Sequence, residues 1–149
     1  MQLSKKSEYA FLALIDIAEN AQMDTQELTK MDEIADRKKI PKKFLEQILL
    51  NLKRAGYVKS KRGIGGGYKL AKHPEEINLA EIIRLFDGAL APVGSASEHF
   101  YEKTPIEKNE NLLATFKEIR DYVAQKLENT TLDDLLRWSD FIVSIYFLA

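Results

Sequence analysis

Side chains that can bind a polyanion are concentrated in one quarter of this 149-residue chain. Residues 37–73 contain twelve Lys and Arg but one acid, Glu46, whereas the whole protein has 22 basic and 23 acidic residues. The segments on either side of this block are acidic, so charge is separated along the chain. This distribution is typical of a surface that binds nucleic acid or another polyanion.

Residues 41–55, inside the basic block, have the spacing of an amphipathic helix. The expected core stripe is Phe44, Leu45, Ile48, Leu49 and Leu52. The opposite face carries Lys43, Glu46, Gln47, Leu50 and Arg54. If this helix enters a DNA major groove, we expect Lys42, Lys43 and Arg54 to neutralise phosphates. Glu46 would then accept a hydrogen bond from a cytosine amino group, and Gln47 would pair with an adenine edge. A solvated helix with ordinary surface charges is the alternative for this segment alone.

A glycine-rich turn at 63–67 lies between two short runs with β propensity, 57–62 and 68–71. Glycines tolerate the positive φ angles of a tight hairpin and let its backbone approach phosphates closely. Arg62 at the tip of such a hairpin can enter the minor groove, where negative potential attracts a guanidinium group. The other hairpin residues expected at DNA are Lys59, Lys61, Gly65, Gly66 and Tyr68. Neither common nucleotide-binding glycine motif is present, and a purely structural hairpin is the alternative.

The segments before the glycine turn predict how these side chains are positioned. Helices are expected at 4–20, at 30–37 with Thr29 as the N-terminal cap, and at 41–55 after a short break. A short helix, a tight break and a second helix with a basic face form a helix-turn-helix, and the hairpin that follows is a wing. Residues 1–74 are therefore predicted to be a winged helix-turn-helix DNA-binding domain. The fold class is mainly α with a small β-hairpin (α+β).

Residues 75–110 are predicted to be a linker with a helix at 79–87, capped by Asn78, and a long irregular loop. A loop of this length in a compact protein is usually functional or disordered. His99, Phe100 and Tyr101 are the candidates for an effector pocket in this loop. An inert loop is the alternative.

Residues 111–149 are predicted to be dimerisation helices. The helix at 111–128 has an apolar stripe, and its expected dimerisation residues are Leu112, Phe116, Ile119, Val123 and Leu127. A last helix, capped by Thr131 with Asp133 and Asp134, becomes apolar on nearly all sides beyond Leu136. Because the winged-helix lobe cannot bury both helices, a two-fold homodimer is the economical arrangement. A helical hairpin within a monomer is the alternative.

Composition excludes several other classes of protein. The chain has no cysteine and two histidines, so disulfides, thiolate metal sites and cysteine nucleophiles are ruled out. We expect no catalytic residues, no metal and no cofactor. No apolar run reaches the ~20 residues that cross a bilayer, and no signal peptide is visible. The expectation is a cytoplasmic protein that is not an enzyme and has no membrane partner.

Several segments together closely resemble the Rrf-type (IscR/NsrR/CymR-like) winged-helix transcription regulators. They are Ser4-x-x-x-x-Tyr9-Ala10, Glu33-Ile34-Ala35, Ile40-Pro41-x-x-Phe44-Leu45-Glu46-Gln47-Ile48-Leu49 and Arg62-Gly63-x-Gly65-Gly66-Gly67-Tyr68. The resemblance implies a homodimer joined by the long helix of each subunit. It also implies base readout at Glu46 and Gln47, minor-groove entry by Arg62, and usually repression from palindromic operators.

Two departures from the family pattern are visible. Many members hold an iron–sulfur cluster on three cysteines in the loop after Ala91-Pro92-Val93, where this chain has residues near Ser95, Thr104 and Glu110. None of these is a thiolate, so the resemblance implies a cluster-free member that responds to a small molecule, to a protein partner or to nothing. Position 39, often glycine in the family, is Lys39, which is strained by roughly 1 kcal/mol if its φ is positive.

The sequence therefore predicts a homodimeric, sequence-specific DNA-binding regulator that binds a palindromic operator, most simply as a repressor. A winged-helix interaction module that docks on an acidic protein partner is the alternative. Salt dependence distinguishes the two, because binding through 6–10 phosphates weakens by roughly 10³–10⁵ between 50 and 200 mM salt.

Overall fold

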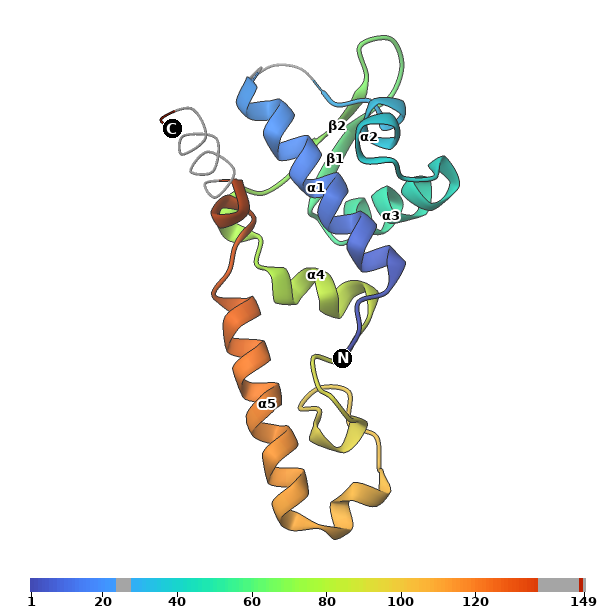
Figure 1. The fold of residues 1–149 in the computed structure, drawn as a ribbon. Coiled ribbons are helices and arrows are strands. Elements are labelled where there is room, and N and C mark those ends of the chain that lie inside the picture. The colour runs from blue at the N-terminus through green and yellow to red at the C-terminus, as the bar shows by residue number, and fades with distance from the viewer. Residues whose placement is uncertain (24–27, 137–147, 149) are drawn as a thin grey trace.

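The structure, a computed structural model, describes residues 1–23, 28–136 and 148. Three helices and a hairpin pack together at one end of the molecule (Figure 1). A fourth helix lies beneath them, and a long helix with an irregular loop beside it extends away as a narrower second part. The predicted mainly α class with a small β-hairpin is confirmed.

The first three helices are α1 (Lys5–Met23), α2 (Met31–Lys38) and α3 (Lys42–Arg54). Lys39 ends α2 in the left-handed region at φ 54°, so the strain predicted for a non-glycine residue at this position is present. This left-handed residue turns the chain sharply between α2 and α3. The helix-turn-helix predicted from the sequence is confirmed.

The predicted core stripe of α3 is correct for four of its five residues, because Leu45, Ile48, Leu49 and Leu52 are buried. They pack with Leu14, Ile17 and Ile34 of the first two helices. The prediction was wrong for Phe44, which is 48% exposed and contacts the ring of Tyr9 edge-on at 6.2 Å between centroids. Phe44 lies at the border between the core and the outer face, so helical spacing alone does not place it.

The predicted wing is confirmed as strands β1 (Val58–Lys61) and β2 (Gly67–Leu70), which pair antiparallel with Val58 opposite Leu70. Thr29 extends this sheet by one bridge, because its N–H donates to the Tyr68 carbonyl at 2.9 Å and its carbonyl accepts from the Tyr68 N–H at 2.7 Å. The prediction that Thr29 caps α2 was therefore wrong. Lys30 is the capping residue, and its N–H donates to the Glu33 carboxylate at 3.3 Å.

A short 3₁₀ turn, η1 (Pro74–Glu76), leads into α4 (Leu79–Phe86). The predicted cap is confirmed, because the Asn78 side chain accepts a hydrogen bond from the Glu81 N–H at 3.0 Å. Gly88 ends this segment at φ 82°. Buried residues of α4 form a second, smaller core cluster with Leu90 of the following loop.

The irregular loop contains two more 3₁₀ turns, η2 (Gly94–Ala96) and η3 (Pro105–Lys108), and precedes α5 (Glu110–Glu128). Thr131 and Asp134 cap the helical residues 132–136 reciprocally, as predicted. The apolar helix expected beyond Leu136 lies outside the described residues. Among the helices that are described, none combines the length and apolarity needed to cross a membrane.

Candidate nucleic-acid interface

Helix α3 presents a polar outer face because its apolar stripe is fixed against α1 and α2. Lys43, Glu46, Gln47 and Arg54 are all exposed on this outer face. Leu50 lies among them and is 38% exposed. One acid and one amide are thus surrounded by cations on a helix whose inner side is held rigidly, an arrangement suited to reading base edges.

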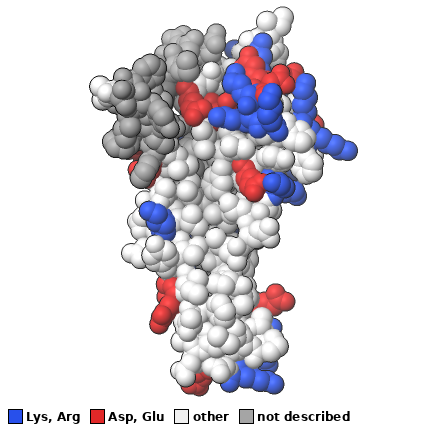
Figure 2. All heavy atoms as spheres, viewed as in Figure 1, with Lys and Arg blue, Asp and Glu red and all other residues white. Residues whose placement is uncertain are grey.

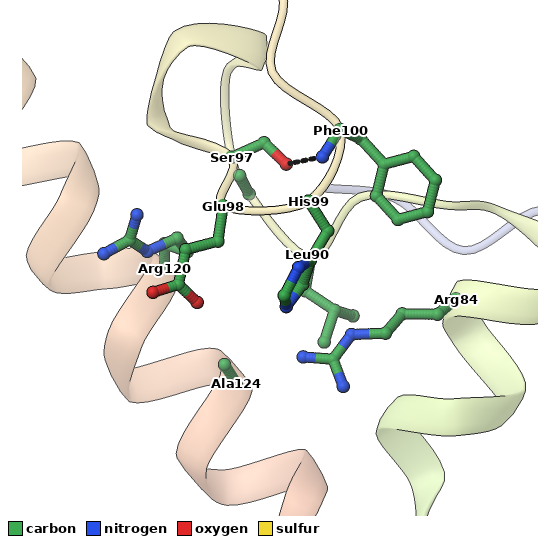
Figure 3. A pocket seen from close by; sticks show the side chains of 9 residues that line it. Arg84, Leu90, Ser97, Glu98, His99, Phe100, Arg120 and Ala124 are labelled. Atoms are coloured by element: carbon green, nitrogen blue, oxygen red, sulfur yellow. Dashed lines mark hydrogen bonds between the residues drawn. The ribbon is translucent and has the colours of Figure 1, made fainter.

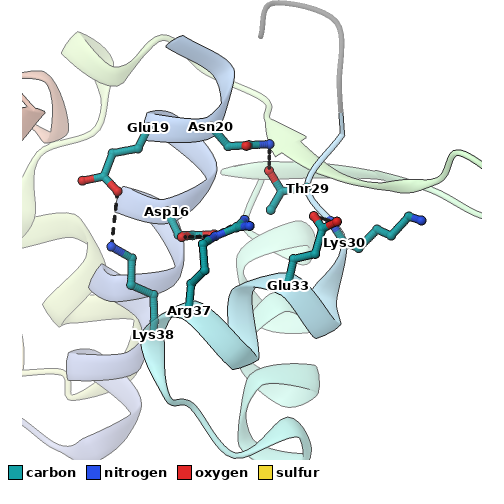
Figure 4. A network of polar contacts seen from close by, with 8 residues as sticks. All are labelled: Asp16, Glu19, Asn20, Thr29, Lys30, Glu33, Arg37 and Lys38. Atoms are coloured by element: carbon teal, nitrogen blue, oxygen red, sulfur yellow. Dashed lines mark hydrogen bonds and ion pairs between the residues drawn. The ribbon is translucent and has the colours of Figure 1, made fainter. Parts of the chain in front are cut away.

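Three of the twelve cations in the basic block form ion pairs within the fold. Arg37 donates two hydrogen bonds of 3.0 Å to Asp16, and Lys38 pairs with Glu19 at 3.2 Å, so α2 is fixed to α1 (Figure 4). The hydrogen bonds that Arg37 donates to Asp16 raise the pKa of Arg37, so its side chain stays charged. Lys42 pairs with Asp32 at 2.8 Å across the turn.

The other nine cations of the block form no ion pair within the parts of the chain that the structure describes. They include Lys43 and Arg54 on α3 and Lys59, Lys61 and Arg62 on the wing. Lys42, which the sequence places at DNA, must exchange Asp32 for a phosphate to act there. The charge left for a polyanion therefore lies mainly on the outer face of α3 and on the wing.

The wing keeps its cations exposed at the edge of the domain. Gly66 is the residue that fixes its turn, because a Cβ there would lie 2.3 Å from the Lys61 carbonyl oxygen. Ile64 at the tip is fully exposed, next to Gly65 and close to Arg62. Tyr68, expected at DNA, is half-buried against the core, and its backbone pairs with Thr29.

Charged side chains are unevenly distributed over the molecule (Figure 2). Lys, Arg and their acidic partners gather at the end that holds the helix-turn-helix and the wing. The middle of the same face, below that end, has few charged side chains. On this face, the Lys and Arg side chains at the helix-turn-helix end are separated from a smaller charged group at the opposite end by a middle region with few charges.

The loop between α4 and α5 forms a small hollow against both helices (Figure 3). His99 and Phe100 line it with Arg84 and Arg120, and its volume is about 20 Å³. Tyr101, the third residue expected there, does not line the hollow; it is 61% exposed, and its hydroxyl donates to Glu107. The hollow has room for about one water molecule.

Hydroxyl groups occupy the part of the loop where the family pattern places cluster ligands. The hydroxyls of Ser95 and Thr104 share a hydrogen bond of 2.6 Å, which joins the two sides of the loop. Glu110 is the exposed first residue of α5. Across residues 1–23 and 28–136, no group of three His, Cys, Asp or Glu side chains could hold a metal ion. These residues do not fit a cysteine-ligated iron–sulfur cluster.

Helix α5 has no buried residue, although it carries the expected dimerisation stripe. Leu112 and Ile119 are each 44% exposed, and Phe116 and Val123 are half-buried. Leu127 differs, because it packs against the small core of α4. Tyr122 is 72% exposed beside the stripe and adds to its apolar surface.

Sequence reasoning missed Lys6 of α1 and Asn51 of α3, which line one groove with Lys43 and Phe44. The hydrophobic spacing of α3 could have indicated Asn51, which lies on the flank of its stripe. No local signal identifies Lys6, because its relation to α3 depends on how α1 packs.

A helix-turn-helix followed by a two-stranded wing, with unpaired cations on both, defines a winged-helix DNA-binding protein. The comparisons with known proteins agree. The chain belongs to the Rrf2 family, described as iron-dependent transcriptional regulators, whose sequence profile matches residues 3–137. It is accordingly a transcription regulator and not an enzyme.

Two regulators illustrate the relationship. CymR of Bacillus subtilis, an HTH-type transcriptional regulator, is 32% identical over 140 residues, which cover 94% of this chain and 93% of CymR. The solved structure of that CymR, described as the global cysteine regulator, matches with a TM-score of 0.71 over 93% of this chain and 98% of CymR. The structure of IscR from T. potens matches at 28% identity, with a TM-score of 0.68, over 93% of this chain and 88% of IscR.

Proposed function

We propose that this protein is a homodimeric repressor that binds a palindromic DNA operator in the cytoplasm. The observation that carries this proposal is the outer face of α3, where Glu46 and Gln47 lie exposed between unpaired cations. In each subunit α3 would enter a major groove, and Arg62 on the wing would reach the adjacent minor groove. The two half-sites would lie about one helical turn, ~34–36 Å, or a multiple of it apart.

Base readout and phosphate contact make different predictions for two neighbouring residues of α3. We expect Glu46→Ala to relax preference at one base pair, with a loss of ~1–3 kcal/mol of discrimination. Lys43→Ala should instead weaken binding to all sequences alike and reduce its salt dependence. The measurement is the affinity of both variants for a panel of single-base operator changes. If both variants lose affinity uniformly, Glu46 does not read a base.

Dimerisation through α5 is proposed because Leu112 and Ile119 of its apolar stripe, with Tyr122 beside them, stay exposed within the described chain. Ile119→Asp would place a charge at the centre of this stripe and should convert the dimer to a monomer with weakened operator binding. Gln125→Asp, on the exposed polar side of the same helix, is the matched control. Sedimentation equilibrium distinguishes the two outcomes. A dimer that survives Ile119→Asp would place the interface elsewhere.

Control of this regulator is proposed to act through the loop that contains His99, Phe100 and Tyr101. The hollow at His99 has about 20 Å³, too little for a metabolite without rearrangement of the loop. Phe100 and Tyr101 are 49% and 61% exposed, which favours a protein partner that binds the outside of the loop. Pull-down with the wild-type protein and with a Phe100→Ser, Tyr101→Ser variant tests this. A partner retained equally by both, or a metabolite that raises the Tm, would contradict it.

A further inference from the structure

A groove between α1 and α3 is not explained by the base-reading face. Its volume is about 390 Å³, and it is lined by Lys6, Lys43, Phe44, Gln47, Ile48 and Asn51. Two cations and two side-chain amides thus surround an apolar floor. This volume falls within the range of sites that hold small molecules or nucleotide-sized groups.

The charge of the groove is positive and unopposed. No carboxylate lines it, and neither Lys6 nor Lys43 forms an ion pair within residues 1–23 and 28–136. The lysines next to them in sequence differ, because Lys5 pairs with Glu8 at 2.6 Å and Lys42 pairs with Asp32 at 2.8 Å. The two cations of the groove are therefore the ones available to an anion.

The floor of the groove is rigid. The ring of Phe44 meets the ring of Tyr9 at an interplanar angle of 61°, which fixes its orientation while half of it stays exposed. The backbone that carries Lys6 is also held, because Ser4, just before α1, and Ser7 in its first turn both donate hydrogen bonds to Asp87. An anion in this groove would meet a floor and a backbone that are already in place.

The groove also borders the outer face of α3. Lys43 and Gln47 belong both to the groove and to the outer face of α3, whereas Phe44 and Asn51 are turned from that face toward α1. If the outer face enters the major groove, the side facing α1 lies against the sugar–phosphate strand that borders it. Lysine ammonium and amide groups are common phosphate ligands, and such contacts fix the register of a protein on DNA.

We propose that the α1–α3 groove binds one sugar–phosphate unit of this bordering strand and that Lys6 is a DNA-binding residue. In this arrangement Lys6 and Lys43 contact the phosphate from opposite sides, Asn51 donates a hydrogen bond to it, and the ring of Phe44 packs against the deoxyribose. The proposal rests on the proposed function, because it assumes that α3 enters the major groove. It adds a backbone contact that positions Glu46 and Gln47 on the bases.

The test compares Lys6→Gln with Lys5→Gln, a matched control because Lys5 is engaged by Glu8. Operator binding of the full-length dimer is measured from 50 to 200 mM salt. Loss of one phosphate contact per subunit, two per dimer, should reduce the log–log salt slope by about 1.8 for Lys6→Gln. The same variant should weaken all operator sequences alike. An unchanged slope for Lys6→Gln, or an equal change for Lys5→Gln, would overturn the proposal.

A second measurement locates the contact on the DNA. Methylphosphonates, which remove the charge of one phosphate, are placed at each backbone position of the operator in turn. The wild type should bind more weakly when the phosphate contacted by Lys6, one beside each half-site, is neutralised. The same neutralisation should have little further effect on Lys6→Gln, which already lacks this contact. If every position affects the two proteins equally, Lys6 contacts no phosphate. If Lys6→Gln has no effect but the wild type still shows Glu46-dependent specificity in these assays, the proposal for Lys6 fails and the proposed function stands.

Discussion

The carboxylate of Asp87, just after α4, caps the N-terminus of α1 through Ser4. The Ser4 N–H donates to Asp87 at 3.0 Å, the Ser4 hydroxyl also donates to it, and the Ser7 hydroxyl adds a third bond at 2.8 Å. Ser4 and Asp87 are 83 positions apart in the sequence. This cluster joins the helix-turn-helix to the segment that leads into the loop, because Gly88 follows Asp87 and lies beneath the ring of Phe100.

Replacement of Asp87 should remove a contribution to folding stability that depends on pH. Burial raises the pKa of Asp87, but the hydrogen bonds from Ser4 and Ser7 together outweigh it and lower the pKa. The stabilisation is therefore present at neutral pH and is lost as pH falls from ~3.9 through the lower folded value. We expect Asp87→Asn to lower the free energy of unfolding by about 1–2 kcal/mol at pH 7.

Urea denaturation at neutral pH and below pH ~3 measures this effect, with the exposed Glu75→Gln as the control. The difference between Asp87→Asn and the wild type should shrink as pH falls, because protonation of Asp87 in the folded state removes its stabilising charge. A difference that is the same at both pH values would mean that the charge of Asp87 has no role.

Tyr57 should make the protein sensitive to alkali. Burial raises its pKa to about 12, and its hydrogen bond of 3.2 Å to Glu81 acts in the same direction. The folded state therefore prefers the neutral phenol, and stability falls as pH rises from ~10, the ordinary value, toward 12. An ultraviolet absorbance titration should show a tyrosine that ionises near pH 12, separate from Tyr101, whose pKa its hydrogen bond to Glu107 also raises. That late step should be missing in Tyr57→Phe; its persistence would assign it to another tyrosine.

Lys39→Gly should stabilise the protein. Lys39 holds φ 54°, which is strained for a residue with a Cβ and free for glycine. We expect a gain of up to about 1 kcal/mol in the free energy of unfolding, reduced by the greater entropy of glycine in the unfolded chain. Lys38→Gly, at the last residue of α2, should instead lose about 1 kcal/mol, because glycine is unfavourable in a helix and the ion pair with Glu19 is lost as well. If the left-handed geometry of residue 39 causes the strain, thermal denaturation should show a higher Tm for Lys39→Gly and a lower Tm for Lys38→Gly than for the wild type.

Gly66→Ala should damage the wing while leaving the helical core folded. An added Cβ would meet the Lys61 carbonyl at 2.3 Å, so the turn that carries Arg62 must move. We expect operator affinity to fall at least about tenfold, equivalent to ~1.4 kcal/mol, with far-ultraviolet circular dichroism nearly unchanged. Ser60→Ala in strand β1 of the same wing is the control. Full operator affinity in Gly66→Ala would show that the wing geometry is dispensable.

The elements of this fold were largely predictable because their signals are local. The apolar spacing of α3, the cap at Asn78 and the glycines of the wing each determine nearby structure, and each was placed correctly except for Phe44 at the border of the α3 stripe. Thr29 was assigned wrongly because its backbone pairs with Tyr68, a contact made by a strand far along the chain. The capping preference of threonine could not compete with that tertiary pairing.

The candidate site was predictable in part for the same reason. The outer face of α3 follows from helical periodicity, so Lys43, Glu46, Gln47 and Arg54 could be named from the sequence. The ion pairs that occupy Arg37, Lys38 and Lys42 depend on how α1, α2 and α3 pack. The same packing creates the groove at Lys6, and no pattern in the sequence predicts this groove.

Selection of bound fragments from the host genome, with purified full-length protein at low and at physiological salt, tests the central claim most directly. A sequence-specific regulator should recover a palindrome upstream of a small number of genes at both salt concentrations. Glu46→Ala should recover the same palindrome with one base position relaxed in each half-site. Recovery of sequence-blind fragments at low salt only, or of no DNA at all, would contradict operator recognition and favour a module that docks on a protein partner.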